Sequence, residues 1–147
     1  MRHSNRWMMV AVLIILSLQL VACGQTQTSS ASIPPARVER LGQTGLSRVI
    51  LTAAAAKRVG IETALVSNTQ VGGTPREAVP YSAVIYDLHG ETWVYTNPEP
   101  LTFVRARITV DSIYGDLAVL SEGPPSGTAV VTVGGSELYG TEFGVGQ

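Results

Sequence analysis

The chain has 147 residues, 14% of them charged, and a formal net charge of −1 at pH 7. It has no block of basic residues, so it lacks the electrostatic footprint of a nucleic-acid-binding protein, and no nucleic-acid partner is expected. Once an N-terminal signal segment and a linker are set aside, about one hundred residues remain, which is enough for one domain with one hydrophobic core.

The first 22 residues are typical of a secretion signal. Arg2, His3 and Arg6 precede an apolar run from Trp7 to Leu20. This run is short for a membrane-spanning helix and fits the apolar core of a signal peptide. The sequence therefore predicts a signal peptide over residues 1–22 and a location outside the cytoplasm.

Cys23 is the expected site of lipid attachment. It follows Leu20-Val21-Ala22, which resembles the lipobox of bacterial lipoproteins, and it is the only cysteine in the chain. Neither a disulfide nor a metal cluster competes for it. The alternative is an ordinary secretory signal with an incidental cysteine. We expect a lipoprotein held on a membrane by the acylated cysteine, with residues 23–47 as a flexible tether whose first part is polar and small.

The segment after the tether predicts a strand, a short helix and a second strand. Arg48 to Leu51 is a β-like run, Thr52 suits the N-cap of a helix over 53–59, and Gly60 suits a left-handed C-terminal residue. A strand pattern resumes over 61–66. A helix this short is marginal alone in water, so it must pack on a sheet.

From Ala78 onward the chain reads as short strands separated by turns. The segments are AVPYSAVIYD, ETWVYT, LTFVRARITV, DLAVLSE and TAVVTVG, separated by LHG, NPEP, DSIYG and GPPSG. The third segment, over 101–110, alternates with a period of two, which indicates a strand with one buried and one solvent-exposed face. We predict a mainly β domain over 48–147: a compact antiparallel β-roll or small sandwich with one short α-helix.

The stretch VPYSAVIYDLHGETWVYTNPEPLTFVRARITV, followed by GDLAVLSEGPPSGTAVVTVGGSELYGTEFGVG, resembles the C-terminal membrane-proximal domain of periplasmic adaptor subunits (membrane fusion proteins) of resistance-nodulation-division efflux transporters. The resemblance covers 79–146 and rests on the order of strands and turns. In that family a similar strand, helix and Gly-Ile strand lies far upstream, because the domain is assembled from both ends of the chain. Here only Ser67–Glu77, a glycine-rich link, separates the two parts.

The resemblance implies a non-enzymatic module that docks on, or assembles with, a tripartite efflux or secretion transporter at the membrane surface. The chain has no room for the barrel, the lipoyl-like domain or the helical hairpin of a complete adaptor, so bridging activity is not implied. Two alternatives stay open. One is a stand-alone extracytoplasmic module that binds a small ligand or a metal, and the other is a truncated adaptor remnant.

Three side chains are candidates for a partner-docking surface. Arg105 and Arg107 share one face of the third strand segment, and the alternation places that face toward solvent. Trp93 shares a face with Tyr95 on the preceding strand, where the rings could form a ligand platform or fill the core. Ordinary exposed charge is the alternative reading for both arginines.

The sequence shows no set of residues with the types and spacing expected of a catalytic site. His89 is the only histidine after the signal segment and lies in a predicted turn without partners at metal-ligand spacing. Asp87, Glu91 and Glu99 lie near it and could form a weak cation site, although carboxylates in such loops are usually solvated. We expect no enzymatic activity, no metal and no cofactor besides the lipid on Cys23.

Overall fold

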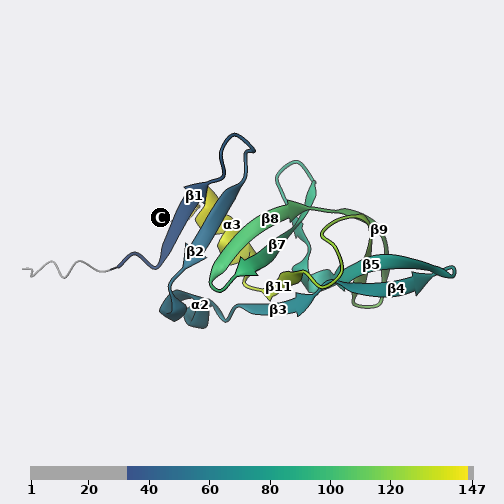
Figure 1. Cartoon of the computed structure of the whole chain (residues 1–147). Coiled ribbons are helices and arrows are strands. Elements are labelled where there is room, and N and C mark those ends of the chain that lie inside the picture. The colour runs from purple at the N-terminus through teal and green to yellow at the C-terminus, as the bar shows by residue number, and fades with distance from the viewer. Residues whose placement is uncertain (1–32, 146–147) are drawn as a thin grey trace, which may run out of the picture. The chain divides into compact units, whose positions relative to one another are not determined.

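The computed structural model describes residues 33–145 (Figure 1). The predicted signal peptide, Cys23 and the first part of the tether lie outside the described residues. The chain divides at Ile33, and Pro34–Gln147 forms one compact unit that holds every strand and helix described. Within residues 33–145 no helix combines the length and the apolarity needed to cross a membrane.

The domain is built from short strands with two α-helices and one 3-10 turn. The strands are β1 (Ala36–Arg40), β2 (Ser47–Leu51), β3 (Glu62–Leu65), β4 (Ser67–Val71), β5 (Thr74–Pro80), β6 (Ile85–Tyr86), β7 (Thr92–Glu99), β8 (Thr102–Arg107), β9 (Thr109–Tyr114), β10 (Leu117–Glu122) and β11 (Ala129–Val133), and the helices are α2 (Ala53–Val59), η2 (Tyr81–Ala83) and α3 (Gly135–Phe143). All strand pairs are antiparallel, which confirms the predicted mainly β fold class.

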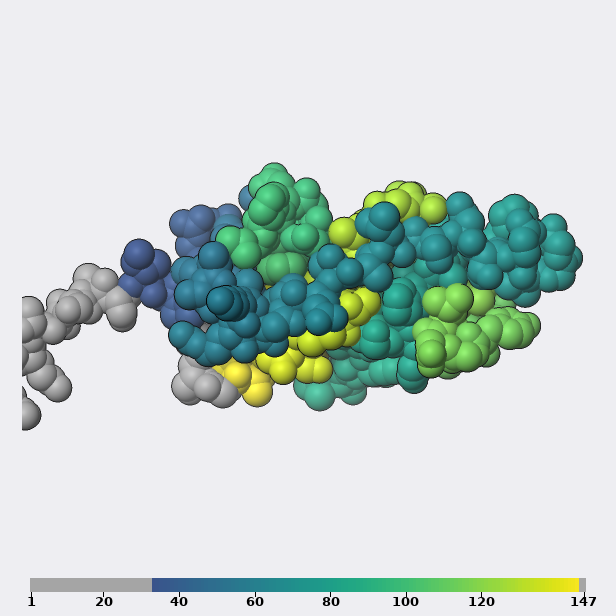
Figure 2. Space-filling model, turned by 90° about the horizontal axis from the view of Figure 1, so that it is seen from below, coloured from purple at the N-terminus to yellow at the C-terminus, as the bar shows by residue number. Residues whose placement is uncertain are grey.

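The strands form two sheets. The larger sheet has the order β1-β2-β8-β7-β11-β3, with β6 also paired to β7, and the smaller has the order β4-β5-β10-β9. The β4–β5 hairpin and the β9–β10 turn gather at one end of the domain, and β1 lies at the other (Figures 1 and 2).

The chain passes between the two sheets four times, and two of these crossings each occur at a single buried residue. Val66 lies between β3 and β4, and Ile108 lies between β8 and β9. Both belong to a core cluster that draws on the two sheets, with Val79, Val94 and Val130 among its members. The strand predicted over 101–110 is therefore two strands in different sheets. Its period of two did not reveal the break, because Ile108 keeps the apolar pattern while the backbone changes sheet.

A second core lies on the opposite face of the larger sheet. It combines sheet residues such as Val49, Tyr95 and Phe103 with Ala55 of α2 and Leu138 of α3. The helices therefore cover this face, and burial of their few apolar side chains stabilises them where length alone would not.

The predicted helix over 53–59 is confirmed at both ends. The Ala55 amide donates to Thr52 Oγ1 at 3.2 Å, and Gly60 closes the helix in the left-handed region with φ 74°. The upstream strand also belongs to the same domain as the later strands, as expected, because β3 pairs with β11 from Leu65↔Ala129 onward.

Four further expectations about the fold were wrong. Residues 33–145 contain two α-helices rather than the one expected, because α3 follows β11. The tether does not extend to residue 47, because β1 pairs along its length with β2 and the domain begins near Pro34. Residues 67–77 are not a bare link but most of the β4–β5 hairpin, which turns at Gly72-Gly73. The larger sheet has no fully solvent-exposed face, because α2 and α3 pack on the side expected to be wet.

Candidate binding groove beside helix α3

Two pairs of side chains share the face of the larger sheet that α3 partly covers. Trp93 on β7 lies opposite Arg107 on β8, and Tyr95 lies opposite Arg105. Directly opposed residues of an antiparallel pair point to the same side of the sheet. The three docking candidates from the sequence, Trp93, Arg105 and Arg107, are therefore brought together on one face.

Arg105 is buried, so its predicted exposure to solvent is wrong. Its Nε donates to Glu142 Oε2 at 2.8 Å, and the side chains of Arg105 and Glu142 are 7% and 2% exposed. The physical reason is α3, which lies over this part of β8 and supplies the compensating carboxylate. A buried arginine is tolerated when such a partner neutralises it.

Tyr95 completes this buried cluster. Its hydroxyl donates to the same Glu142 oxygen at 2.6 Å. Burial, together with this hydrogen bond, raises the pKa of Tyr95 far above its ordinary value, so the hydroxyl stays protonated and acts as a donor. One carboxylate on α3 thus ties together β7 and β8.

The guanidinium of Arg105 also organises aromatic rings. Its Cζ lies 4.4 Å from the ring centroid of Trp93, 4.9 Å from that of Phe143 and 5.9 Å from that of Tyr139. These distances are typical of cation–π contacts. Phe143 and Tyr139 also contact each other, with centroids 4.6 Å apart. The arginine therefore fixes an aromatic wall that joins the sheet to α3.

Arg107 lies two residues further along β8, beyond the cover of α3. Its side chain is 63% exposed, and its Nη2 donates to Glu91 Oε1 at 2.6 Å. Its predicted exposure is confirmed, and its role in docking stays a prediction.

The predicted turn around His89 is confirmed and is held by Asp87. One carboxylate oxygen of Asp87 accepts from the amides of His89 and Glu91 at 2.8 and 2.9 Å, and the other accepts from Trp93 Nε1 at 3.1 Å. Desolvation acts to raise the pKa of this carboxyl, but the two backbone N–H groups and the indole outweigh it and hold the pKa below its ordinary value. Asp87 is therefore ionised at neutral pH and orients the ring of Trp93.

A groove of about 630 Å³ runs beside α3 over these residues. The β1–β2 loop supplies Leu46 to its lining, the β6–β7 turn supplies Asp87 and Leu88, β7 supplies Trp93, and α3 supplies Tyr139 and Phe143. Leu88 is 94% exposed, and Phe143 and Val145 at the same groove are also exposed. Apolar side chains thus face solvent around a concave surface.

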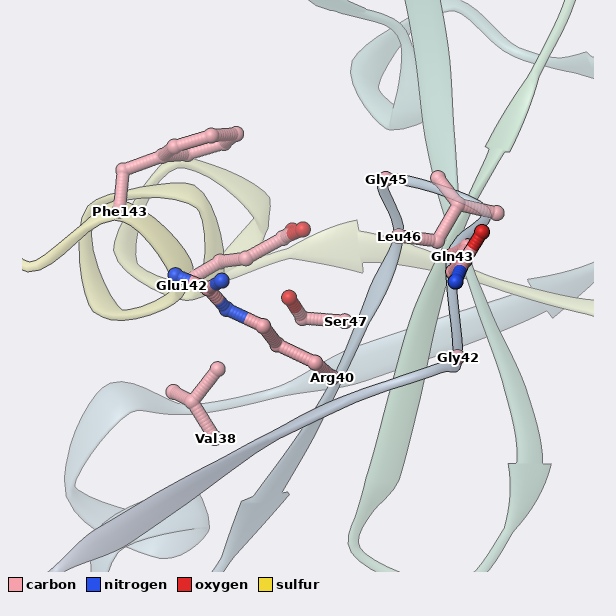
Figure 3. A pocket seen from close by; sticks show the side chains of 9 residues that line it. All are labelled: Val38, Arg40, Gly42, Gln43, Gly45, Leu46, Ser47, Glu142 and Phe143. Atoms are coloured by element: carbon pink, nitrogen blue, oxygen red, sulfur yellow. The ribbon is translucent and has the colours of Figure 1, made fainter.

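A second hollow of about 610 Å³ lies between the β1–β2 hairpin and the end of α3 (Figure 3). Arg40 and Ser47 extend into it from the β1–β2 hairpin toward Glu142 on α3 (Figure 3). Glu142 lines this hollow and Arg105 lines the groove, and Gly45, Leu46 and Phe143 line both.

The weak cation site considered near His89 is not assembled. Residues 33–145 contain no group of three His, Cys, Asp or Glu side chains placed to hold a metal ion. Glu91 instead pairs with Arg107, and Glu99 lies at the far end of β7.

Glu142, Tyr139 and Phe143 were missed as site residues by sequence reasoning. The signal available was the spacing of four between Leu138 and Glu142 and between Tyr139 and Phe143, which places each pair on one side of a helix.

The chain has a partial likeness to a solved structure. No family model and no curated protein matches the chain. The solved structure is an NMR structure of a 180-residue segment of SilB from Cupriavidus metallidurans CH34 that holds its N-terminal metal-binding site and membrane proximal domain. The TM-score is 0.44 at 24% identity, and the match covers 56% of this chain and 48% of that chain.

Proposed function

We propose that this protein is a lipid-anchored, non-enzymatic adaptor-like module that docks on, or assembles with, a tripartite efflux or secretion transporter at the membrane surface. The lipid on Cys23 holds it there, outside the cytoplasm. The proposal is supported by the resemblance of residues 79–146 to the membrane-proximal domain of efflux adaptor subunits.

The observation that carries the proposal is the pairing of β3 with β11. This pairing joins the strand–helix–strand segment upstream of residue 66 to residues 79–146, the region that resembles the adaptor domain, in a single sheet. This assembly of one domain from an early and a late segment is what the resemblance leads one to expect. The hairpin β4–β5 closes the gap that larger domains occupy in a complete adaptor.

We place the docking surface of this proposal near the exposed end of β8. Arg107 is available there, whereas Arg105 is neutralised by Glu142 and acts by positioning Trp93 and Phe143. Exposed charges contribute little affinity by themselves, but they guide encounter and orientation. Arg107 therefore orients a partner, and neighbouring apolar side chains supply the binding energy.

Photocrosslinking in native membranes tests this function. A photoreactive amino acid in place of Tyr86, an exposed residue that lines the same hollow as Arg107 and leaves the arginine intact, should capture a transporter subunit from membranes that contain the full-length lipidated chain. Arg107→Glu should weaken co-purification of that subunit. Arg37→Glu is the matched control, because Arg37 is also an exposed arginine in a short ion pair, with Glu39 at 2.7 Å on β1.

The proposal fails if crosslinking captures no transporter subunit, or if Arg37→Glu weakens co-purification as much as Arg107→Glu does.

A further inference from the structure

We propose that the groove beside α3 binds a cationic amphiphile, a small molecule with an apolar ring system and an ammonium group. This function is independent of docking on a transporter. It follows from the size, lining, charge and rigidity of the groove.

The size and lining of the groove suit a small molecule. Its volume of about 630 Å³ lies within the range of about 300–1,000 Å³ that is usual for ligand sites. Trp93, Tyr139 and Phe143 present aromatic surface, and Leu88 forms an exposed apolar side. Burial of such surface against a ligand ring favours binding.

The charge of the groove lining determines which sign of charge a ligand should carry. Arg105 lines the groove, but its charge is balanced by Glu142 at 2.8 Å. Asp87 also lines the groove, and among residues 33–145 it accepts only N–H groups that carry no formal charge, from two backbone amides and the indole of Trp93. Among the carboxylates and arginines of the lining, Asp87 therefore carries the one uncompensated charge, which an ammonium group complements.

The carboxylate of Asp87 has capacity for a further donor. Two carboxylate oxygens offer about four acceptor positions in total, and the protein uses three of them. A ligand ammonium would approach the oxygen that accepts only from Trp93 Nε1. The ring system of the ligand would then lie along the aromatic wall.

The rings of this wall are held before any ligand arrives. The indole of Trp93 is fixed by its hydrogen bond to Asp87 and by the guanidinium of Arg105, which also contacts Phe143. A site that is already ordered loses less conformational entropy on binding. The buried ion pair therefore acts as the support of the groove and not as its ligand-binding charge.

A matched series of naphthalene compounds tests the proposal. The probes are naphthylmethylammonium, naphthylmethanol and naphthoate, which share one ring system and differ in charge. They are titrated at pH 7 into the segment 34–147, which contains both sheets and both cores. Trp93 is the only tryptophan in this segment, so its indole N–H signal in proton–nitrogen NMR spectra reports on the groove directly.

The cation should shift the Trp93 signal saturably and bind about fivefold or more tightly than the neutral alcohol, since one ion pair at 4 Å in water contributes about that factor. The anion should bind most weakly. Asp87→Asn should reduce the preference for the cation over the alcohol to less than twofold, and the intact NMR spectrum of the variant would show that it is folded.

Leu88→Ser should weaken all three probes without unfolding the domain, because Leu88 is almost fully exposed. Leu65→Ser is its control, since Leu65 is an exposed leucine on β3 that does not line the groove. Tightest binding of naphthoate would overturn the proposal and indicate that the terminal nitrogens of Arg105 select an anion. The absence of saturable binding, or equal effects of Leu88→Ser and Leu65→Ser, would also overturn it.

Discussion

The two arginine–glutamate pairs on β8 allow a direct test of what holds α3 on the sheet. Arg105 pairs with Glu142 at 2.8 Å with both side chains buried, and Arg107 pairs with Glu91 at 2.6 Å with side chains 63% and 36% exposed. Distance alone would make the exposed pair the stronger one. We expect the opposite order of effects on stability when one partner is removed.

The difference arises from the charge that each substitution leaves behind. Arg105→Met strands the Glu142 carboxylate, and Glu142→Gln strands the Arg105 guanidinium. Removal of one partner of a buried pair costs roughly 3–5 kcal/mol in free energy of unfolding, and we expect values near 3 because Arg105 borders the groove. The corresponding substitutions at the exposed pair, Arg107→Met and Glu91→Gln, should each lower the free energy of unfolding by about 0–1 kcal/mol.

Urea unfolding of the segment 34–147 at pH 7 measures both pairs, with Trp93 fluorescence and far-ultraviolet circular dichroism as probes. A domain of this size has a total stability of about 5–15 kcal/mol, so a loss of about 3 is readily resolved. The double variant Arg105→Met/Glu142→Gln should lose less than the sum of the single variants, because neither charge is then stranded. Equal losses at the buried and exposed pairs would refute this reasoning.

Three further predictions concern separate parts of the chain. Cys23→Ser should abolish fatty-acid labelling and release a folded domain from membranes, whereas unchanged labelling would contradict lipid attachment at this residue. The folded-state pKa of Asp87 lies below its ordinary value of 3.8, so the ionised carboxylate stabilises the fold above the unfolded-state pKa, and this stabilisation is lost as pH falls through the folded-state pKa. The difference in free energy of unfolding between wild type and Asp87→Asn should therefore shrink below about pH 4. A difference that grows there would exclude this role. Gly134→Ala should destabilise by about 2 kcal/mol or more, because Gly134 has φ 90° and a Cβ there would lie 2.8 Å from Val59 Cγ1 and 2.4 Å from Ile61 Cδ1. Gly115→Ala, at φ 57° in open space, should cost only about 1 kcal/mol, and thermal melts with equal losses would contradict the steric argument.

Local chemistry made some elements predictable from sequence. Helix α2 was predicted with its bounds because Thr52 and Gly60 act within one turn of the residues they cap. The turn at Asp87–Gly90 depended on the same kind of short-range signal. Strand β1 was missed because four of its five residues, ARVER, are charged or small, and its pairing with β2 is visible only in the fold.

The buried ion pair was unpredictable for a different reason. A charged residue on the outer face of a strand indicates exposure to solvent only if no later element covers that face. Here α3, which follows the last strand, covers it. Its sequence conceals this cover, because Glu142 interrupts the apolar pattern of the helix while Arg105 interrupts that of β8. Each charge alone predicts exposure, and both are buried because each neutralises the other.

The same partial cover explains why this face carries a groove. Helix α3 reaches Arg105 but leaves Arg107 exposed, so the aromatic residues at its border are packed on one side and open on the other. A shorter helix would expose the ion pair to water and release the ring of Phe143. A longer helix would bury Trp93 and close the groove. The concave aromatic surface therefore depends on where the helix ends, which is set by Gly144 in the left-handed region at φ 67°.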